Sequence, residues 1–220
     1  MDADIEHGRA GAAMTGARPV TSQAGAVARA QRLEYFTIAW NSLEAFVALL
    51  AGFLAASVAL VGFGFDSLIE VASGAALLWR LHRGERAERA ALRMVGGCFV
   101  ALALYIAYDS THTLWLREAP RGSMAGIALT AVTIVVMPLL ARAKRQAAES
   151  LASGAMRADA RQSEFCMYLS GIVLGGLLLN ALLGWWWADP LAGLVMVPIV
   201  GKEGIDALRG KACCAGDGCH

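Results

Sequence analysis

Residues 57–80 read SVALVGFGFDSLIEVASGAALLWR, an apolar run with two acids in its middle. At about 1.5 Å per residue, a helix of this length crosses a hydrocarbon core of about 30 Å. Asp66 and Glu70 are four residues apart, which places both carboxylates on one helix face. A carboxylate at membrane depth costs about 2.5–3.5 kcal/mol to insert, so it normally faces a bundle interior or an ion pathway. The stretch therefore predicts a membrane helix that carries half of a cation site.

The composition of the whole chain is typical of a multi-pass membrane protein. Of its 220 residues, 57% are hydrophobic and 17% are charged, and the mean hydropathy is +0.53. The net charge of +1 offers no basic surface, so we expect no nucleic-acid partner. No disulfide framework is expected, because two cysteines lie in apolar segments and three in a tail assigned to the reducing cytosol: Cys98, Cys166, Cys213, Cys214 and Cys219.

Hydropathy predicts an all-α membrane protein built as a bundle of six transmembrane helices. We expect residues 1–28 to be a disordered cytoplasmic segment, 29–209 the transmembrane domain and 210–220 a Cys-rich cytoplasmic tail. Asp189 followed by Pro190 predicts a helix N-cap and first helical position. The expected spans are 35–56, 58–81, 94–116, 124–141, 156–186 and 188–205.

The positions of the basic residues predict the orientation of the bundle. Of the 19 Lys and Arg residues, all but Arg117 and Arg121 fall on the side that holds both chain ends. Lys144 is counted there with the link between the fourth and fifth spans. The positive-inside rule makes this side cytoplasmic. We therefore expect a multi-pass protein of the cell (inner) membrane with both termini in the cytoplasm.

Polar residues at the start of the fifth span predict the second half of the site. Asp159, Gln162 or Ser163, and Cys166 follow one another at three- and four-residue steps, so they share one helix face. Gln162 and Cys166 repeat the four-residue spacing of the acidic pair. With about 1.5 Å of rise per residue, they lie level with the two acids within one turn. Whether Gln162 or Ser163 faces the site stays open.

With these residues, the chain resembles the transmembrane domain of the cation diffusion facilitators, which are divalent-metal/proton antiporters. The resemblance covers residues 33–208 and depends on the six expected helices, the 66–70 motif DSLIE and the 158–160 motif ADA. In that family, an HxxxD or DxxxD pair on the second helix and an HxxxD pair on the fifth form the transport site. Carried over, the resemblance implies a site on Asp66, Glu70, Gln162 and Cys166.

The chain departs from the family pattern in its ligands and its length. Neither helix has a histidine at the site, and the fifth has no carboxylate at either expected position. Two carboxylates, an amide and a thiolate suit zinc, but also iron, cobalt or manganese, so the metal stays open. Ten residues follow Gly210, so we expect the family's usual cytoplasmic domain to be missing and the likeness to be to a short, transmembrane-only branch. Homodimer formation therefore stays open.

Several other polar residues have both a functional and a structural interpretation. Asp159 either feeds or ligates the cation, or simply opposes the dipole at its helix N-terminus. Asn41 and Glu44 either complete the site or relay protons, or they form an interhelical hydrogen bond. The tail either captures a metal, carries a lipid or is unstructured, and its candidate ligands are Cys213, Cys214, Cys219 and His220.

These observations favour a transporter that exports a divalent cation from the cytoplasm in exchange for protons. Metal ligands must be deprotonated, so an entering cation expels protons. The expected partners are the metal ion, protons and membrane lipid, with no permanent cofactor. One alternative is a non-transporting membrane module that senses or binds metal with its tail. An enzyme is not expected, because the sequence shows no nucleophile–base set, phosphate loop or cofactor motif.

Overall fold

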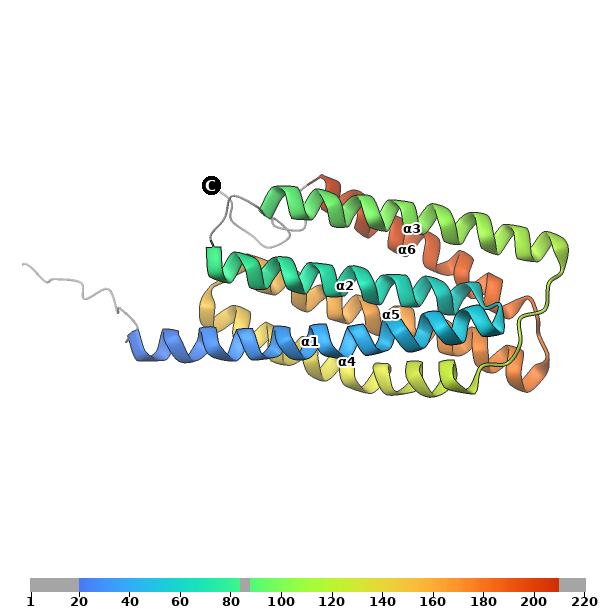
Figure 1. Ribbon diagram of the computed structural model, residues 1–220, viewed down its shortest axis with the longest axis horizontal. Coiled ribbons are helices and arrows are strands. Elements are labelled where there is room, and N and C mark those ends of the chain that lie inside the picture. The colour runs from blue at the N-terminus through green and yellow to red at the C-terminus, as the bar shows by residue number, and fades with distance from the viewer. Residues whose placement is uncertain (1–19, 84–87, 210–220) are drawn as a thin grey trace, which may run out of the picture.

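A computed structural model describes residues 20–83 and 88–209 of the chain (Figure 1). The expected all-α class is confirmed over these residues, which form no strand. The predictions for the first 19 residues and for the Cys-rich tail lie outside the described residues. The described helices are α1 (Val20–Ala55), α2 (Val58–Arg83), α3 (Glu88–Leu116), α4 (Met124–Leu151), α5 (Gly154–Leu183) and α6 (Ala188–Leu208).

Four of these helices are long and apolar enough to cross a membrane, judged by length and composition. They contain the candidate spans 25–55, 58–79, 124–151 and 159–183. In the described part of the chain, α3 and α6 fall short of the same criterion. For α6 the reason is its charge, because 21 residues include Asp189, Lys202, Glu203 and Asp206.

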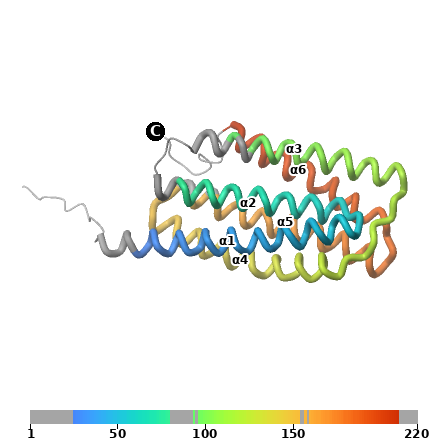
Figure 2. Tube along the Cα trace, in the orientation of Figure 1, coloured from blue at the N-terminus to red at the C-terminus, as the bar shows by residue number. Residues whose placement is uncertain are grey.

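The helices form an elongated bundle in which neighbours along the chain run in opposite directions (Figure 2). Figure 1 shows α3 with α6 along one side, α2 with α5 in the middle, and α1 with α4 along the other side. The two middle helices contact each other, and each also packs against both outer pairs. The two helices that carry the predicted halves of the site are therefore the central ones.

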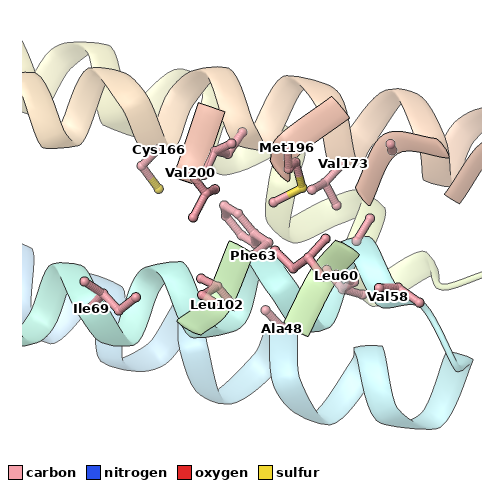
Figure 3. Close-up of a cluster of buried hydrophobic side chains, with 14 of the residues drawn as sticks. Ala48, Val58, Leu60, Phe63, Ile69, Leu102, Cys166, Val173, Met196 and Val200 are labelled. Atoms are coloured by element: carbon pink, nitrogen blue, oxygen red, sulfur yellow. The ribbon is translucent and has the colours of Figure 1, made fainter. Parts of the chain in front are cut away.

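An apolar core with members from all six helices surrounds the predicted site (Figure 3). Phe63 is fully buried at its centre, and Met196 and Val200 of α6 pack into the same cluster. Ile69, which lies between the two acids on α2, and Cys166 of the predicted ligand set belong to the same cluster. The acidic pair is therefore enclosed by apolar side chains and not only flanked by them.

Two glycines allow α3 and α6 to approach closely. A Cβ added at Gly96 would lie 2.8 Å from the backbone nitrogen of Leu208, and one at Gly204 would lie 2.9 Å from the Cβ of Phe99. Small residues at such a contact let helix backbones pack against each other in a membrane. The closely packed α3 and α6 both contact α2, which carries the acidic pair.

Several helix ends differ from those predicted. α1 begins at Val20, so residues 20–28 are helical where disorder was expected. α4 continues ten residues beyond the predicted end at Ala141, to Leu151, and α5 ends at Leu183 instead of Trp186. Hydropathy locates the apolar part of a helix, but a helix can continue through polar residues past it. Lys144 therefore belongs to a helix and not to a loop.

Asp189 stabilises a different helix from the one predicted. It lies in the first turn of α6 with its side chain fully buried. Its Oδ1 accepts a hydrogen bond from Ser57 Oγ at 2.5 Å. Ser57 Oγ in turn accepts one from the backbone N–H of Leu60 at 3.1 Å, as an N-cap residue does. The predicted capping of α6 by Asp189 is wrong, because its carboxylate is used at the start of α2.

Candidate functional site

Four helices direct polar side chains into the interior of the bundle. Within α1, α2 and α5 these residues follow one another mostly at three- and four-residue steps, which keeps them on one helix face. All of them are buried. The set consists of Glu34, Thr37, Asn41 and Glu44 from α1; Asp66, Ser67 and Glu70 from α2; Thr130, Thr133 and Lys144 from α4; and Asp159, Ser163, Cys166 and Ser170 from α5.

The acidic pair on α2 is fully enclosed and only partly hydrogen-bonded. Asp66 is 1% exposed, and neither of its carboxylate oxygens accepts a hydrogen bond from a residue that the structure describes. Glu70 Oε1 accepts one from Ser163 Oγ at 2.9 Å, whereas Glu70 Oε2 has no donor among the described residues. A buried acceptor left unpaired costs about 1–3 kcal/mol, and more if it is charged. The α2 pair therefore presents three buried oxygens without a donor among the described residues, within one helical turn.

Glu44 connects the site across four helices. Its carboxylate accepts hydrogen bonds from Ser67 Oγ at 3.2 Å, from the Thr133 hydroxyl, and weakly from Cys166 Sγ at 4.0 Å. These donors belong to α2, α4 and α5. Asn41, one turn before Glu44 on α1, is buried, and its amide has no hydrogen-bond partner among the described residues. The structure therefore places both α1 residues at the interior face where the sequence analysis proposed an accessory role.

On α5, Ser163 is the residue that contacts the acidic pair. Ser163 is fully buried and donates to Glu70, while Gln162 is half-buried. Cys166 is 1% exposed and lies three residues further along the same face. Both Gln162 and Ser163 fit the spacing from Asp159 to Cys166, so spacing alone leaves the choice open. The rotation of α5 against its neighbours decides it.

A second polar cluster lies one turn from Glu70, toward the α4–α5 end of the bundle. Lys144 is fully buried, forms an ion pair with Asp159, and has its Nζ 3.7 Å from Glu34 Oε2. The Glu34 carboxylate lies against Gly74, where an added Cβ would be 3.2 Å from Oε2. Ser163, which donates to Glu70, follows Asp159 by four residues on the same face of α5. The two clusters therefore meet along α5.

The sequence analysis missed Glu34 and Lys144 because both lie just outside the predicted apolar spans. Glu34 precedes Glu44 by steps of three, four and three residues through Thr37 and Asn41. This helical spacing could have identified Glu34 as an interior residue. Lys144 offered no comparable signal, since its partners come from α1 and α5.

The interior holds far more acidic than basic groups. In the polar set given above, Lys144 supplies the one buried ammonium, against five buried carboxylates, those of Glu34, Glu44, Asp66, Glu70 and Asp159. Among the described residues, no three His, Cys, Asp or Glu side chains are arranged closely enough to hold one metal ion. The proposed tail ligands lie outside the described residues.

A helical membrane bundle whose interior carries an excess of carboxylates belongs to the class of proteins that bind or move cations. A family model of the cation efflux transmembrane domain matches residues 35–211. The chain belongs to the cation efflux family and is, at that level, a multi-pass membrane protein that transports metal cations. A search of curated proteins found no match to the chain.

Proposed function

We propose that the chain exports a divalent metal cation from the cytoplasm in exchange for protons, through a midplane site on Asp66 and Glu70. All six helices would cross the cell membrane, and both termini would lie in the cytoplasm, as the distribution of Lys and Arg favours. The observation that supports this proposal most directly is that Asp66 is enclosed and neither of its carboxylate oxygens has a donor among the described residues. One turn away, Glu70 Oε2 also lacks a donor among them. A carboxylate in that position needs a cation or a proton.

The proposed ligand set follows from what surrounds these oxygens. Cys166 supplies a thiolate on the facing helix, and Glu44 lies on the other side of that thiol, 4.0 Å from its sulfur. Ser163 orients Glu70, and Gln162 is the least enclosed member of the predicted set. Carboxylates with one thiolate suit zinc, iron(II), cobalt and manganese.

Proton exchange follows from the chemistry of these ligands. A carboxylate or thiol binds metal only after losing its proton, so cation binding releases protons and proton return releases the cation. The hydroxyl groups that donate to Glu44 and Glu70 are neutral. They can donate to a carboxylate or accept from a carboxylic acid, so the same surroundings serve both states of the site.

The test is metal-dependent proton flux in liposomes that contain the purified protein and a pH dye. Zinc, iron(II), cobalt, manganese and cadmium are offered in turn. We expect flux with at least one ion and its loss in Asp66→Asn, which keeps the side-chain shape and removes the charge. Asp109→Asn is the matched control, because this half-buried carboxylate lies on α3, outside the interior, and accepts from Tyr105 at 3.2 Å.

Two results would contradict the proposal. Unchanged flux in Asp66→Asn would remove the acidic pair from the transport site. No flux with any of these ions, from protein shown to be folded, would favour the non-transporting metal binder. Deletion of residues 213–220 would then test whether metal binding depends on the tail.

A further inference from the structure

We propose that Glu34 and Asp159 form a second cation site on the cytoplasmic side of the acidic pair. The Lys144 ammonium fills this site until a divalent cation displaces it. We call Glu34, Asp159 and Lys144 the inner site. This inference rests on the proposed function for one point, that the cation arrives from the cytoplasm. Binding there does not itself require transport, so the two proposals can fail separately.

The first support is the way the three charges are arranged. Lys144 comes from α4 and lies between a carboxylate of α1 and one of α5, with all three side chains buried. Both oxygens of Glu34 and Oδ1 of Asp159 lack a hydrogen-bond donor among the described residues. The ammonium approaches Glu34 Oε2 only to 3.7 Å, and it leaves two enclosed oxygens, Glu34 Oε1 and Asp159 Oδ1, with neither a donor nor an ion-pair partner among the described residues. Such unused oxygens are expected where a larger charge than one ammonium has to be accommodated.

The second support is the position of the inner site. Gly74, against which Glu34 lies, follows Glu70 by four residues, or about 6 Å along α2. Asp159 precedes Cys166 by seven residues, or about 10 Å along α5. Both displacements point toward the α4–α5 end of the bundle (Figure 1). A cation moving from that end to Asp66 passes the inner site first.

The third support is charge selectivity. Two carboxylates and one ammonium carry one net negative charge, and two carboxylates with a divalent cation carry none. Replacing the ammonium with a monovalent ion leaves the net charge of the site unchanged, whereas replacing it with a divalent ion neutralises the site. Lysine is suited to leave, because its ammonium is a point charge on a flexible stem that can move to a polar boundary. The inner site would thus admit divalent cations and stay closed to monovalent ones.

The test measures Mn²⁺ binding by the loss of the free-ion electron paramagnetic resonance signal, since an all-oxygen site suits manganese. Asp66→Asn is the background, so that the midplane site is disabled. Adding Lys144→Met should tighten binding at least tenfold, and Lys144→Arg should not. Adding Glu34→Gln should remove the gain, whereas Glu149→Gln, at an exposed carboxylate of α4, should leave it in place. Equal affinities with and without Lys144→Met in folded protein would overturn the proposal.

A second measurement uses the unaltered chain, in case the variants do not fold. A membrane-impermeant amine reagent is applied with and without saturating Mn²⁺, and modified lysines are located by mass spectrometry. Labelling of Lys144 should rise severalfold with the metal, while the exposed Lys202 serves as reference and should not change. Unchanged labelling of Lys144 would overturn the proposal. If Asp66→Asn still transports metal while Mn²⁺ raises the labelling of Lys144, the midplane site is overturned and the inner site is not.

Discussion

Replacing Lys144 with methionine should lower the free energy of unfolding by about 3–5 kcal/mol, the usual cost of removing one partner from a buried ion pair. Methionine keeps an unbranched chain of similar length, so lost packing contributes little. The ammonium lies 3.7 Å from Glu34 and closer to Asp159. At an effective dielectric of about 20, the attraction at 3.7 Å is about 4 kcal/mol before desolvation is subtracted. Two carboxylates would lose this attraction together.

The structure also predicts an order among the variants. Asp159→Asn should cost less than Lys144→Met, because the ammonium keeps Glu34 as a partner. The double variant leaves only Glu34 without a cation, so it should be more stable than Lys144→Met alone. In a double-mutant cycle, this appears as a coupling energy within the usual range of about 0.5–3 kcal/mol.

The assay is unfolding of the purified protein in mixed micelles, followed by the fluorescence of its six tryptophans. Lys202→Met is the control, because Lys202 is exposed and its removal should leave stability unchanged. Mn²⁺ should restore more stability to Lys144→Met than to the unaltered protein, since a ligand stabilises the state that binds it. The reasoning is refuted if Lys144→Met costs under about 1 kcal/mol, below the range for a broken buried pair, or if the double variant is the least stable.

Two further predictions concern hydrogen bonds. Ser163→Ala should raise the metal concentration for half-maximal transport about tenfold, because Glu70 loses a donor worth about 1.5–3 kcal/mol. Gln162→Ala should change this concentration less than about twofold. A larger effect of Gln162→Ala would contradict the observed rotation of α5. Ser57→Ala should lower the free energy of unfolding by about 1–3 kcal/mol, because α2 loses its N-cap and Asp189 is left buried without its donor. Thermal unfolding measures this, and an unchanged midpoint would argue against the capping role.

Sequence alone predicts the arrangement of the bundle well where the signal is hydrophobic. The second span was expected at residues 58–81, and α2 occupies Val58–Arg83. The four-residue spacing of Asp66 and Glu70 correctly indicated that both face the interior, where both are buried. These features depend on helical periodicity within one segment. A single sequence contains all the information that they require.

The place of Lys144 in the inner site could not be predicted in the same way, because this residue is identified only by its partners. Lys144 follows a long apolar run, and hydropathy treats a lysine there as the end of the span. Its burial depends on Glu34 and Asp159, which come from α1 and α5. Similarly, a local rule assigns Asp189 to its own helix, whereas tertiary packing places it at the start of α2. Contacts between segments, which no local pattern describes, determined both outcomes.

The two groups of buried acids differ in how their charge is compensated, and this difference fits a pathway. The acids of the inner site are paired with the ammonium of Lys144, which is part of the chain, so a passing metal ion would have to displace it. Around Asp66, Glu70 and Glu44, the donors that the structure describes are hydroxyl groups and one thiol. A second lysine there would lie one turn further from the cytoplasmic end than Lys144, so its ammonium could not withdraw to a polar boundary and would exclude the cation. Neutral donors leave the choice between a metal ion and protons to the surroundings, as exchange between the two requires. We therefore expect a lysine introduced at Ser163 to abolish transport while preserving the fold.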